Sequence, residues 1–401
     1  MSSALIALST VRNVRPWGGD PVDLTITDGV ISKIAATTAS PSAAASSAGA
    51  GSAYDGRGLL ALPGLVNAHA HIDKSWWGLP WQSYGGEGGT EGRIRHERAR
   101  RDEIGMPSVE ITRNVLDQLV RHGTTAIRTH VDVDLGLGLR GIDVVREAVA
   151  AYDGALAVEI VAFPQDGVLR RPGVFDLLAR AAQAGAEHIG GLDPATIDRD
   201  PVGQIDAILG LAAEHGVGVD IHLHDPADLG AFQIELILAR VAELGLEGRV
   251  NIAHGFAVAE LERARRRDLL AQMGELGVTM TTVAPLRLPQ LPLDELDAVG
   301  VVLGFGTDGI RDLWSPYGTG DLLGIAWQYA RASSLVRDDD LRRVVEIAAG
   351  GSAPFAGLPA NRLAVGDRAD LVPLDAGNPM DALVRTPPRE AVIAAGRLLV
   401  G

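Results

Sequence analysis

Two histidines stand two residues apart where a long apolar segment ends, since His69 and His71 close the run that begins at Leu62. Because side chains alternate across a β-strand, both imidazoles leave such a strand on the same face. Two neutral imidazoles are a common part of a protein zinc site. An isolated His-x-His also occurs in ordinary core packing, so the pair indicates a metal only if other segments supply further ligands at comparable positions.

Other histidines also stand at the ends of apolar, strand-like segments. Six of the ten histidines lie at the carboxyl ends of predicted strands: His69, His71, His130, His222, His224 and His254. In a barrel of parallel strands these ends form the face where active sites are built. The chain has no cysteine, so imidazoles and carboxylates must hold the metal. We expect three nitrogens and one oxygen as ligands, with a position left open for water: His69, His71, His222 and Asp308.

Eight predicted strands, separated by helical segments, place these residues. The first strand runs from Leu62 into the His-x-His pair, and seven more follow at residues 125–131, 156–163, 188–192, 218–224, 249–254, 278–283 and 301–308. Most of the intervals carry Ala- and Leu-rich amphipathic sequence, as at 174–184, 204–215 and 232–244. This alternation predicts an α/β fold, a (β/α)8 TIM barrel that spans residues 61–358.

Both ends of the chain have β character. An Asp28-Gly29 pair between two alternating runs predicts a hairpin over residues 23–34, and residues 389–400 predict another. Residues 36–53 are mostly Ala, Ser, Gly and Thr, which predicts a mobile loop, and residues 54–58 predict a turn. Since both β segments lie outside the barrel, we expect residues 1–60 and 359–401 to pair as one small discontinuous β-sandwich domain.

A glycine-rich insertion follows the first barrel strand, and an arginine-dense segment comes directly after it, with Arg93, Arg95, Arg98, Arg100 and Arg101. A Gly-hinged insertion beside a metal site predicts a lid, with an ordinary solvated helix as the equal alternative. Ser108 then caps a predicted helix whose apolar residues follow the 3.6-residue period from Val109 to Val120.

Charge and hydropathy narrow the class of protein. Lys and Arg number 36 against 51 Asp and Glu, so the formal net charge is −15. A surface this acidic repels phosphate backbones, which argues against a nucleic-acid partner. No run approaches the ~18–20 apolar residues that span a membrane, and the apolar stretch after Met1 lacks the basic start of a secretion signal. We expect a cytoplasmic, homo-oligomeric enzyme with a small-molecule substrate.

The segment from Pro63 to Lys74 reads Pro-Gly-x-x-Asn-Ala-His-Ala-His-Ile-Asp-Lys. Together with Gly306-Thr307-Asp308 it closely resembles the amidohydrolase superfamily, and residues 128–132 and 161–167 resemble its cytosine deaminase branch. Residues 190–196, 220–225 and 310–321 are similar to the triazine-degrading isopropylaminohydrolases. The resemblance implies one divalent metal, zinc in most members and iron in some. The chain agrees, because the lysine that bridges two metals in other members is absent at the end of the fourth strand, residues 190–193.

One position departs from the cytosine deaminase pattern. Those enzymes place a glutamate three residues after the third metal histidine, whereas this chain has Asp225 there, preceded by His224. Strand alternation puts His224 on the face of His222 and turns Asp225 away unless the strand has ended. The triazine-degrading isopropylaminohydrolases share this His-x-His-Asp pattern, and this resemblance implies that His224 is the acid/base residue, with Asp225 as the alternative.

These features predict a hydrolase that removes an amino or alkylamino group from a nitrogen heterocycle, a cytosine-like pyrimidine or a hydroxylated s-triazine. Hydroxide that the metal generates attacks the ring carbon, Asp308 takes the water's proton, His224 protonates a ring nitrogen and His254 hydrogen-bonds the incoming oxygen. The residues expected to bind the ring are Gln165, Trp314, Lys74 and Asp193. An ordinary solvated lysine is the equal alternative for Lys74. Cyclic-amide hydrolysis is the alternative reaction, and a non-catalytic metal-binding scaffold is the alternative class.

Overall fold

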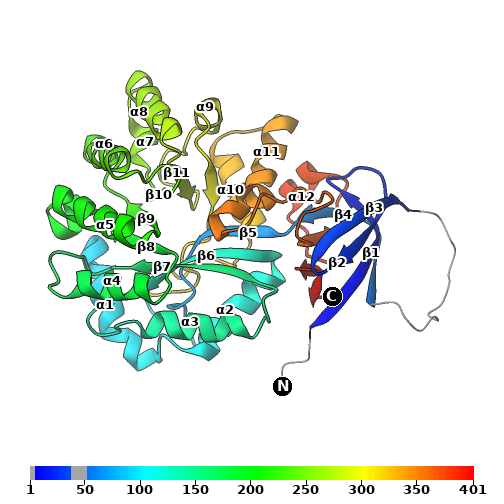
Figure 1. Ribbon diagram of the computed structural model, residues 1–401, viewed down its shortest axis with the longest axis horizontal. Coiled ribbons are helices and arrows are strands. Elements are labelled where there is room, and N and C mark those ends of the chain that lie inside the picture. The colour runs from blue at the N-terminus through cyan, green and yellow to red at the C-terminus, as the bar shows by residue number, and fades with distance from the viewer. Residues whose placement is uncertain (1–4, 38–51) are drawn as a thin grey trace.

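Eight parallel strands lie side by side in sequence order and form the centre of the larger part of the molecule (Figure 1). The structure is a computed structural model that describes residues 5–37 and 52–401. The strands of this sheet are β5 Leu65–Ala70, β6 Thr124–Asp132, β7 Ala157–Phe163, β8 His188–Leu192, β9 Gly218–Leu223, β10 Val250–His254, β11 Thr279–Thr282 and β12 Leu303–Phe305. Every residue of β5, β6, β9 and β10 is buried, as expected for strands covered on both faces.

The segment after β12 closes this sheet into a barrel. The backbone N–H of Asp308 donates to the carbonyl oxygen of His69 over 3.0 Å, and Asp308 forms a parallel bridge with Ala70. Gly306 permits the close approach of the two segments, because a Cβ at this position would lie 2.4 Å from the backbone oxygen of His69. The predicted (β/α)8 TIM barrel is confirmed.

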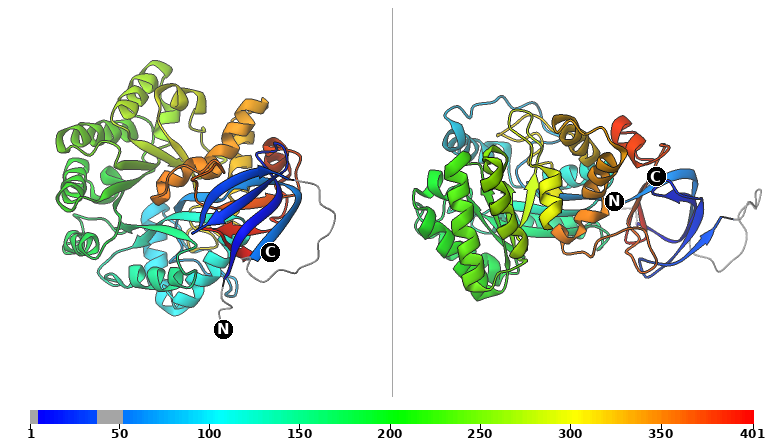
Figure 2. Two further views of the ribbon diagram at one scale, coloured as in Figure 1. Left: turned by 45° about the vertical axis from the view of Figure 1, so that its right-hand side comes forward. Right: turned by 90° about the horizontal axis from the view of Figure 1, so that it is seen from above.

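Helices surround the barrel (Figures 1 and 2). The helices of the barrel part are α1 Gly89–Ile104, α2 Val109–Arg121, α3 Arg140–Ala150, α4 Val174–Gln183, α5 Pro201–His215, α6 Ala227–Leu244, α7 Ala257–Glu260, α8 Arg263–Glu275, α9 Leu293–Val299, α10 Leu322–Ala332 and α11 Asp338–Ala348, with short helices η1 Pro194–Asp198 and η2 Gly350–Ala356. Helix α2 begins where predicted, because the Ser108 side chain accepts a hydrogen bond from the Ile111 N–H over 3.2 Å. No helix among the described residues is long and apolar enough to cross a bilayer.

The two ends of the chain share a second sheet beside the barrel, where blue and red strands lie together in Figure 2. Its strands are β1 Ile6–Pro16, β2 Val22–Thr27, β3 Val30–Ala36, β4 Ser52–Pro63, β13 Leu371–Leu374, β14 Val392–Ala394 and β15 Arg397–Val400. The sheet folds back on itself, because β15 pairs with β1 as well as with β14. It encloses an apolar core of its own, to which both ends contribute residues such as Val11, Leu24 and Leu371.

The segment that leads into β4 corrects two details. The loop expected at residues 36–53 lies mostly outside the described residues, which resume at Ser52. The turn predicted at residues 54–58 is wrong, because these residues continue β4 alongside β1, with Tyr54 opposite Val11. Their turn-like composition instead produces an irregularity within the strand, where the register shifts and Arg57 has a φ of 53°. The C-terminal segment also contains a helix, α12 Pro379–Arg385, which packs against α10 and α11.

Candidate active site

The carboxyl ends of β5 and β9 bring three imidazoles together at the mouth of the barrel. His69 lies in β5, His71 directly follows it, and His222 lies one residue before the end of β9. The ring centroid of His69 lies 5.4 Å from that of His71 and 4.6 Å from that of His222, and the Nε2 atoms of His71 and His222 are 3.2 Å apart. All three side chains are buried, so the sequence prediction that they converge agrees with the structure.

Asp308 completes this group from the segment after β12, where the barrel closes against β5. Its Oδ1 lies 3.3 Å from Nε2 of His71 and 3.7 Å from Nε2 of His69. Burial acts to raise the pKa of Asp308, but the neighbouring imidazoles of His69 and His71 outweigh it and hold the pKa well below its usual range. The preceding residue is fixed as well, because the Thr307 N–H donates to Asn67 Oδ1 over 3.1 Å. Asp308 is therefore held in place as a carboxylate.

The chemistry of this donor set fits a divalent metal. Both ring nitrogens of His69, and Nδ1 of His71 and His222, are buried without a hydrogen-bond partner. Buried polar atoms are rarely left in this state unless an ion or water completes them. Burial is the main cause that lowers the pKa of His71 and of His222 well below the ordinary value, which keeps both rings in the neutral form that binds metals.

A fourth imidazole, His130 at the end of β6, also reaches this cluster. Candidate ligand atoms of His69, His71, His130 and His222 all lie within 4.8 Å of one another. The Nε2 of His130 lies 3.3 Å from Asp220 Oδ1, and Asp220 also accepts hydrogen bonds from Arg128 and Asn251. His130 therefore borders a buried polar network on β6, β9 and β10, although neither of its ring nitrogens has a hydrogen-bond partner among the described residues, and its position in the sequence did not reveal this neighbourhood.

His224 and His254 are the other two imidazoles of the mouth, with ring centroids 4.3 Å apart. His254 is the last residue of β10, and both of its ring nitrogens are buried without a partner. His224 follows the end of β9, and its Nδ1 lies 3.0 Å from Oδ2 of Asp193. Burial acts to lower the pKa of His224, but the charge and hydrogen bond of Asp193 raise it overall.

The two neighbouring carboxylates, Asp193 and Asp225, lie outside the active-site cavity. The sequence predicts that Asp193 binds the ring, with Asp225 as the alternative acid/base residue. Asp193 is buried behind His224 and does not line the active-site cavity. Asp225 accepts hydrogen bonds from Thr196 Oγ1 and, over 3.0 Å, from Gln233 Nε2, and it does not line the cavity either. The strand ends at Leu223, yet Asp225 still turns toward α6 because these two donors hold it there.

A cavity of about 280 Å³ opens beside the imidazoles. The metal-site histidines His71 and His222 line it. So do the predicted catalytic residues His224, His254 and Asp308. The predicted ring-binding residues that line it are Gln165, Lys74 and Trp314. Phe163 and Leu192 add apolar surface, and Arg93 and Thr90 reach the cavity from α1. A cavity of this size, with one apolar wall and converging polar groups, suits a single small ring.

Lys74 and Gln165 belong to a buried polar network at one wall of this cavity. The Lys74 ammonium donates to Asp132 Oδ1 over 3.0 Å and to Gln165 Oε1 over 2.5 Å. Gln165 Nε2 in turn donates to Glu97 and Asp132. Burial acts to lower the pKa of Lys74, but the charges of Asp132 and Glu97 outweigh it and raise the pKa. The solvated alternative for Lys74 is wrong, since the side chain is buried and paired.

Glu97 is a site residue that sequence reasoning missed. It lies on α1, is 1% exposed, and accepts a hydrogen bond from Trp314 Nε1 over 2.6 Å as well as one from Gln165. The arginine-dense sequence around it gives α1 almost no apolar periodicity, which hides the buried face of the helix. The spacing of Ile94, Glu97 and Arg101, which are all buried, is the signal that was present. Helix α1 therefore forms part of the cavity wall. An ordinary solvated helix is one of the two alternatives predicted from the sequence for this segment, but one face of the helix is buried.

A barrel whose mouth gathers buried imidazoles and one carboxylate around a small cavity is typical of hydrolases that use a divalent metal. Comparison with known proteins agrees. Residues 176–400, more than half of the chain, match the model of the amidohydrolase family. The chain belongs to the amidohydrolase family, and it is a hydrolase that acts on carbon–nitrogen bonds other than peptide bonds.

Individual relatives are similar over most of their length. The chain is 29% identical to N-isopropylammelide isopropyl amidohydrolase of Pseudomonas sp. strain ADP, with 86% of this chain and 87% of the relative covered. The solved structure of N-isopropylammelide isopropylaminohydrolase from Burkholderia multivorans ATCC 17616 is 39% identical, covers 98% of both chains and has a TM-score of 0.91. That of 5-methylcytosine deaminase from Klebsiella pneumoniae, with 5-fluorocytosine bound, is 26% identical, covers 98% of this chain and 97% of that one, and has a TM-score of 0.80. The resemblance inferred from the motifs is thereby confirmed.

Proposed function

We propose that this enzyme removes an amino or alkylamino group from a small nitrogen heterocycle and leaves an oxygen on the same ring carbon. The observation that carries the proposal is the placement of His224, whose Nδ1 is held by Asp193, in the same cavity as Asp308 and His254. The N-isopropylammelide and 5-methylcytosine enzymes to which the chain is similar support this reaction class. The ring is a hydroxylated s-triazine or a cytosine-like pyrimidine.

The residues that would hold the metal are His69, His71, His222 and Asp308. Three imidazoles and a carboxylate form a complete set for one divalent ion, for which we propose zinc, with iron as the alternative. When bound, the ion lowers the pKa of water enough to make hydroxide available at neutral pH. We place His130 outside this set, because its Nε2 lies 3.3 Å from Oδ1 of Asp220, a carboxylate that Arg128 and Asn251 hold in place.

The chain's own groups then handle the protons. Asp308, ionised and beside the ligand histidines, accepts a proton from the attacking water. His224 donates a proton to a ring nitrogen, which prevents negative charge from building up as the new carbon–oxygen bond forms. His254 hydrogen-bonds the incoming oxygen. When the carbon–nitrogen bond breaks, the leaving amine takes up the proton held by Asp308, directly or through His224. The hydroxyl proton on the ring carbon's new oxygen reprotonates His224 as the ring carbonyl forms, so water and substrate give a ring carbonyl and a neutral amine.

Ring recognition falls to the opposite polar wall. Lys74 uses two of its three N–H groups on Asp132 and Gln165, which leaves one for a ring oxygen. Both N–H groups of Gln165 are taken by Glu97 and Asp132, so Gln165 offers the ring only the second lone pair of Oε1. Trp314, held by Glu97, supplies an aromatic face. This wall suits a ring with an oxygen acceptor next to an N–H donor.

Two alternatives remain to be separated by experiment. A cyclic-amide hydrolase would use the same groups on a ring carbonyl and would open the ring. A non-catalytic scaffold has no use for a carboxylate held ionised in the cavity beside His224, so we rank it below both enzymes. The presence of His224 at the cavity favours attack at a carbon next to a protonatable ring nitrogen.

The test is a panel assay of the metal-loaded protein with N-isopropylammelide, cytosine, 5-methylcytosine and cyclic amides such as dihydropyrimidines. We expect release of isopropylamine or ammonia, equimolar with a ring product in which oxygen has replaced the nitrogen substituent. Ring-opened products without amine release would assign the protein to the cyclic-amide hydrolases. No turnover of any compound by fully metal-loaded protein would support the scaffold.

A further inference from the structure

Helix α1 presents two faces to different parts of the molecule. Glu97 contacts the active-site wall through Gln165 and Trp314, and Arg93 lines the active-site cavity. Glu91, Arg95 and Arg98, spaced i, i+4 and i+7, lie along another side of the helix and line a separate pocket. The active site uses only the first of these faces.

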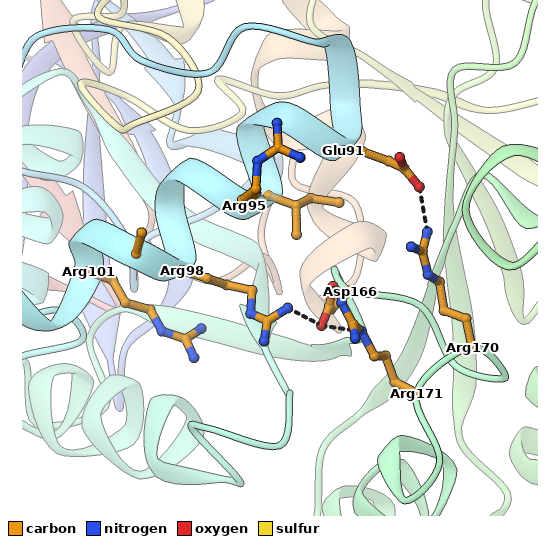
Figure 3. Close-up of a pocket in the computed structure, with 9 residues that line it drawn as sticks. Glu91, Arg95, Arg98, Arg101, Asp166, Arg170 and Arg171 are labelled. Carbon is orange, nitrogen blue, oxygen red and sulfur yellow. Dashed lines mark hydrogen bonds and ion pairs between the residues drawn. The ribbon is translucent and has the colours of Figure 1, made fainter.

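The second pocket has a volume of about 520 Å³ and lies between α1 and the segment that joins β7 to α4 (Figure 3). Its lining is rich in guanidinium groups: Arg95, Arg98, Arg101, Arg170 and Arg171. Only two carboxylates, Glu91 and Asp166, line it with them. We call it the arginine pocket. Five arginines in one pocket are unexpected in a chain whose net charge is −15.

The ion pairs of the arginine pocket leave positive charge uncompensated. Arg98 and Arg171 share one carboxylate, because a nitrogen of each lies 2.7 Å from Oδ2 of Asp166. Arg170 pairs with Glu91 over 2.8 Å, and Arg101 pairs with Asp134, which does not line the pocket. Arg95 has no carboxylate within ion-pair distance in the part of the chain that the structure describes. Five arginines thus face three carboxylates, a formal surplus of two positive charges.

Two further observations indicate that the arginine pocket suits an anion. The Arg101 side chain is buried, with 7% of the residue exposed, and its Nε has no hydrogen-bond acceptor. A buried guanidinium N–H without an acceptor is costly. At the pocket rim the pKa of Glu91 is lowered, first by its hydrogen bond and then by its charge interaction with Arg170, with contributions from Arg199 and Arg95. Arginines therefore outnumber carboxylates around this pocket although the protein as a whole is acidic.

We propose that the arginine pocket binds a small oxyanion with at least two negative charges, a phosphate or a polycarboxylate. Guanidinium forks match the paired oxygens of both groups, and the surplus of two positive charges matches the charge of the ligand. The volume accommodates a small metabolite and exceeds that of inorganic phosphate alone. The ligand differs from the ring substrate in charge, and it binds on the far side of α1 from Glu97 and Arg93.

An anion in this pocket would act on the active site through α1. It would draw Arg95 and Arg98 on the helix toward Arg170 and Arg171, on the segment that begins right after Gln165. Glu97, on the same helix, bonds Gln165 and Trp314 in the cavity wall. Binding would therefore hold α1 against the cavity wall, so the anion should tighten binding of the ring substrate. This coupling rests on the proposed function, whereas anion binding itself does not.

The chain offers a matched control pocket between α8 and α9. It has a volume of about 630 Å³ and is lined by Arg263 and Arg267 together with Asp268, Asp294 and Glu295. Its two arginines face three carboxylates, so it has no surplus of positive charge. A variant in this pocket removes a surface guanidinium without touching the arginine pocket.

The test is isothermal titration of the metal-loaded, full-length protein with inorganic phosphate, pyrophosphate and citrate, with chloride as the monovalent control. We expect one binding event per chain for phosphate-type or polycarboxylate anions, and the tighter of the two classes identifies the ligand. Arg95→Ala and Arg98→Ala should each weaken it by about tenfold or more, whereas Arg267→Ala should not change it. An anion bound at the metal site would be insensitive to Arg95 and Arg98, so equal affinities in all variants would overturn the proposal, as would the absence of binding.

Amide hydrogen exchange supplies an independent readout. At a concentration that just saturates the wild-type protein, the anion should slow exchange in residues 89–104 of the wild-type protein and of Arg267→Ala, and much less in Arg95→Ala. Unchanged exchange in α1 of the wild-type protein, despite saturation, would contradict the coupling of the arginine pocket to the helix. Neither readout requires turnover, so a failure of the proposed enzymatic function would leave this test intact.

Discussion

Asp193 holds His224 through both of its carboxylate oxygens. Oδ2 lies 3.0 Å from Nδ1 of the imidazole, and Oδ1 accepts a hydrogen bond from the backbone N–H of His224 over 2.5 Å. The second bond fixes the loop after β9, and the first assigns a proton to Nδ1, which leaves Nε2 to exchange a proton with a substrate. A carboxylate between β8 and η1 therefore orients His224, which we propose as the acid/base residue.

The first prediction concerns His224 itself. His224→Ala should lower kcat by ~10²–10⁴-fold, the usual contribution of a positioned proton donor, while the metal content stays that of the wild-type protein. Asp225→Asn is the matched control and should cost much less, because Asp225 is engaged with Thr196 and Gln233. Steady-state kinetics with metal analysis decide between them. If Asp225→Asn is inactive and His224→Ala is not, Asp225 is the acid/base group.

Asp193→Asn should act through His224. The amide can still accept the backbone N–H, but its NH₂ group would face Nδ1 and favour the wrong tautomer of the imidazole. We expect kcat to fall by about 10–100-fold with KM little changed, and Asp193→Glu to recover part of the loss. The measurement is the split between kcat and KM, with thermal unfolding as the control. A change in KM alone would return Asp193 to the substrate-binding role that the sequence suggested.

The barrel and the convergence of His69, His71, His222 and Asp308 could be predicted because both depend on regular spacing. Histidines two residues apart stand at the carboxyl ends of β5 and β9. The parallel strands of a barrel bring these ends to one face. The roles of Asp193 and Glu97 could not be predicted in this way. Asp193 meets His224 across two different strand ends, and Glu97 is buried on a helix whose charged sequence gives no apolar stripe. Such contacts depend on loop and helix placement, which periodicity does not define.

Lys74→Met should destabilise the fold as well as impair ring binding. The substitution removes the buried cation and leaves Asp132 and Glu97 without their counter-charge, a change that typically costs about 3–5 kcal/mol. Lys33, the other lysine of the chain, is exposed on β3, so Lys33→Met is the matched control and should be neutral. Chemical denaturation of both variants measures the free energy of unfolding. Equal stability of the two variants would show that the network of Lys74 does not depend on its charge.

Metal analysis tests the ligand set. The wild-type protein should bind one equivalent of a divalent metal per chain, and His222→Ala should lose most of it on dialysis. His130→Ala should retain much more metal, because we place His130 in the network of Asp220 rather than among the ligands. Two equivalents, both needed for activity, would contradict a mononuclear site. Metal loss in His130→Ala as complete as in His222→Ala would make His130 a ligand.

The most direct test of the central claim is the fate of the exocyclic nitrogen when N-isopropylammelide or cytosine is turned over in isotopically labelled water. We predict one labelled oxygen on the ring carbon that carried the nitrogen, with one equivalent of isopropylamine or ammonia released and the ring intact. Label in a new carboxylate of a ring-opened product, with the exocyclic nitrogen retained, would contradict it.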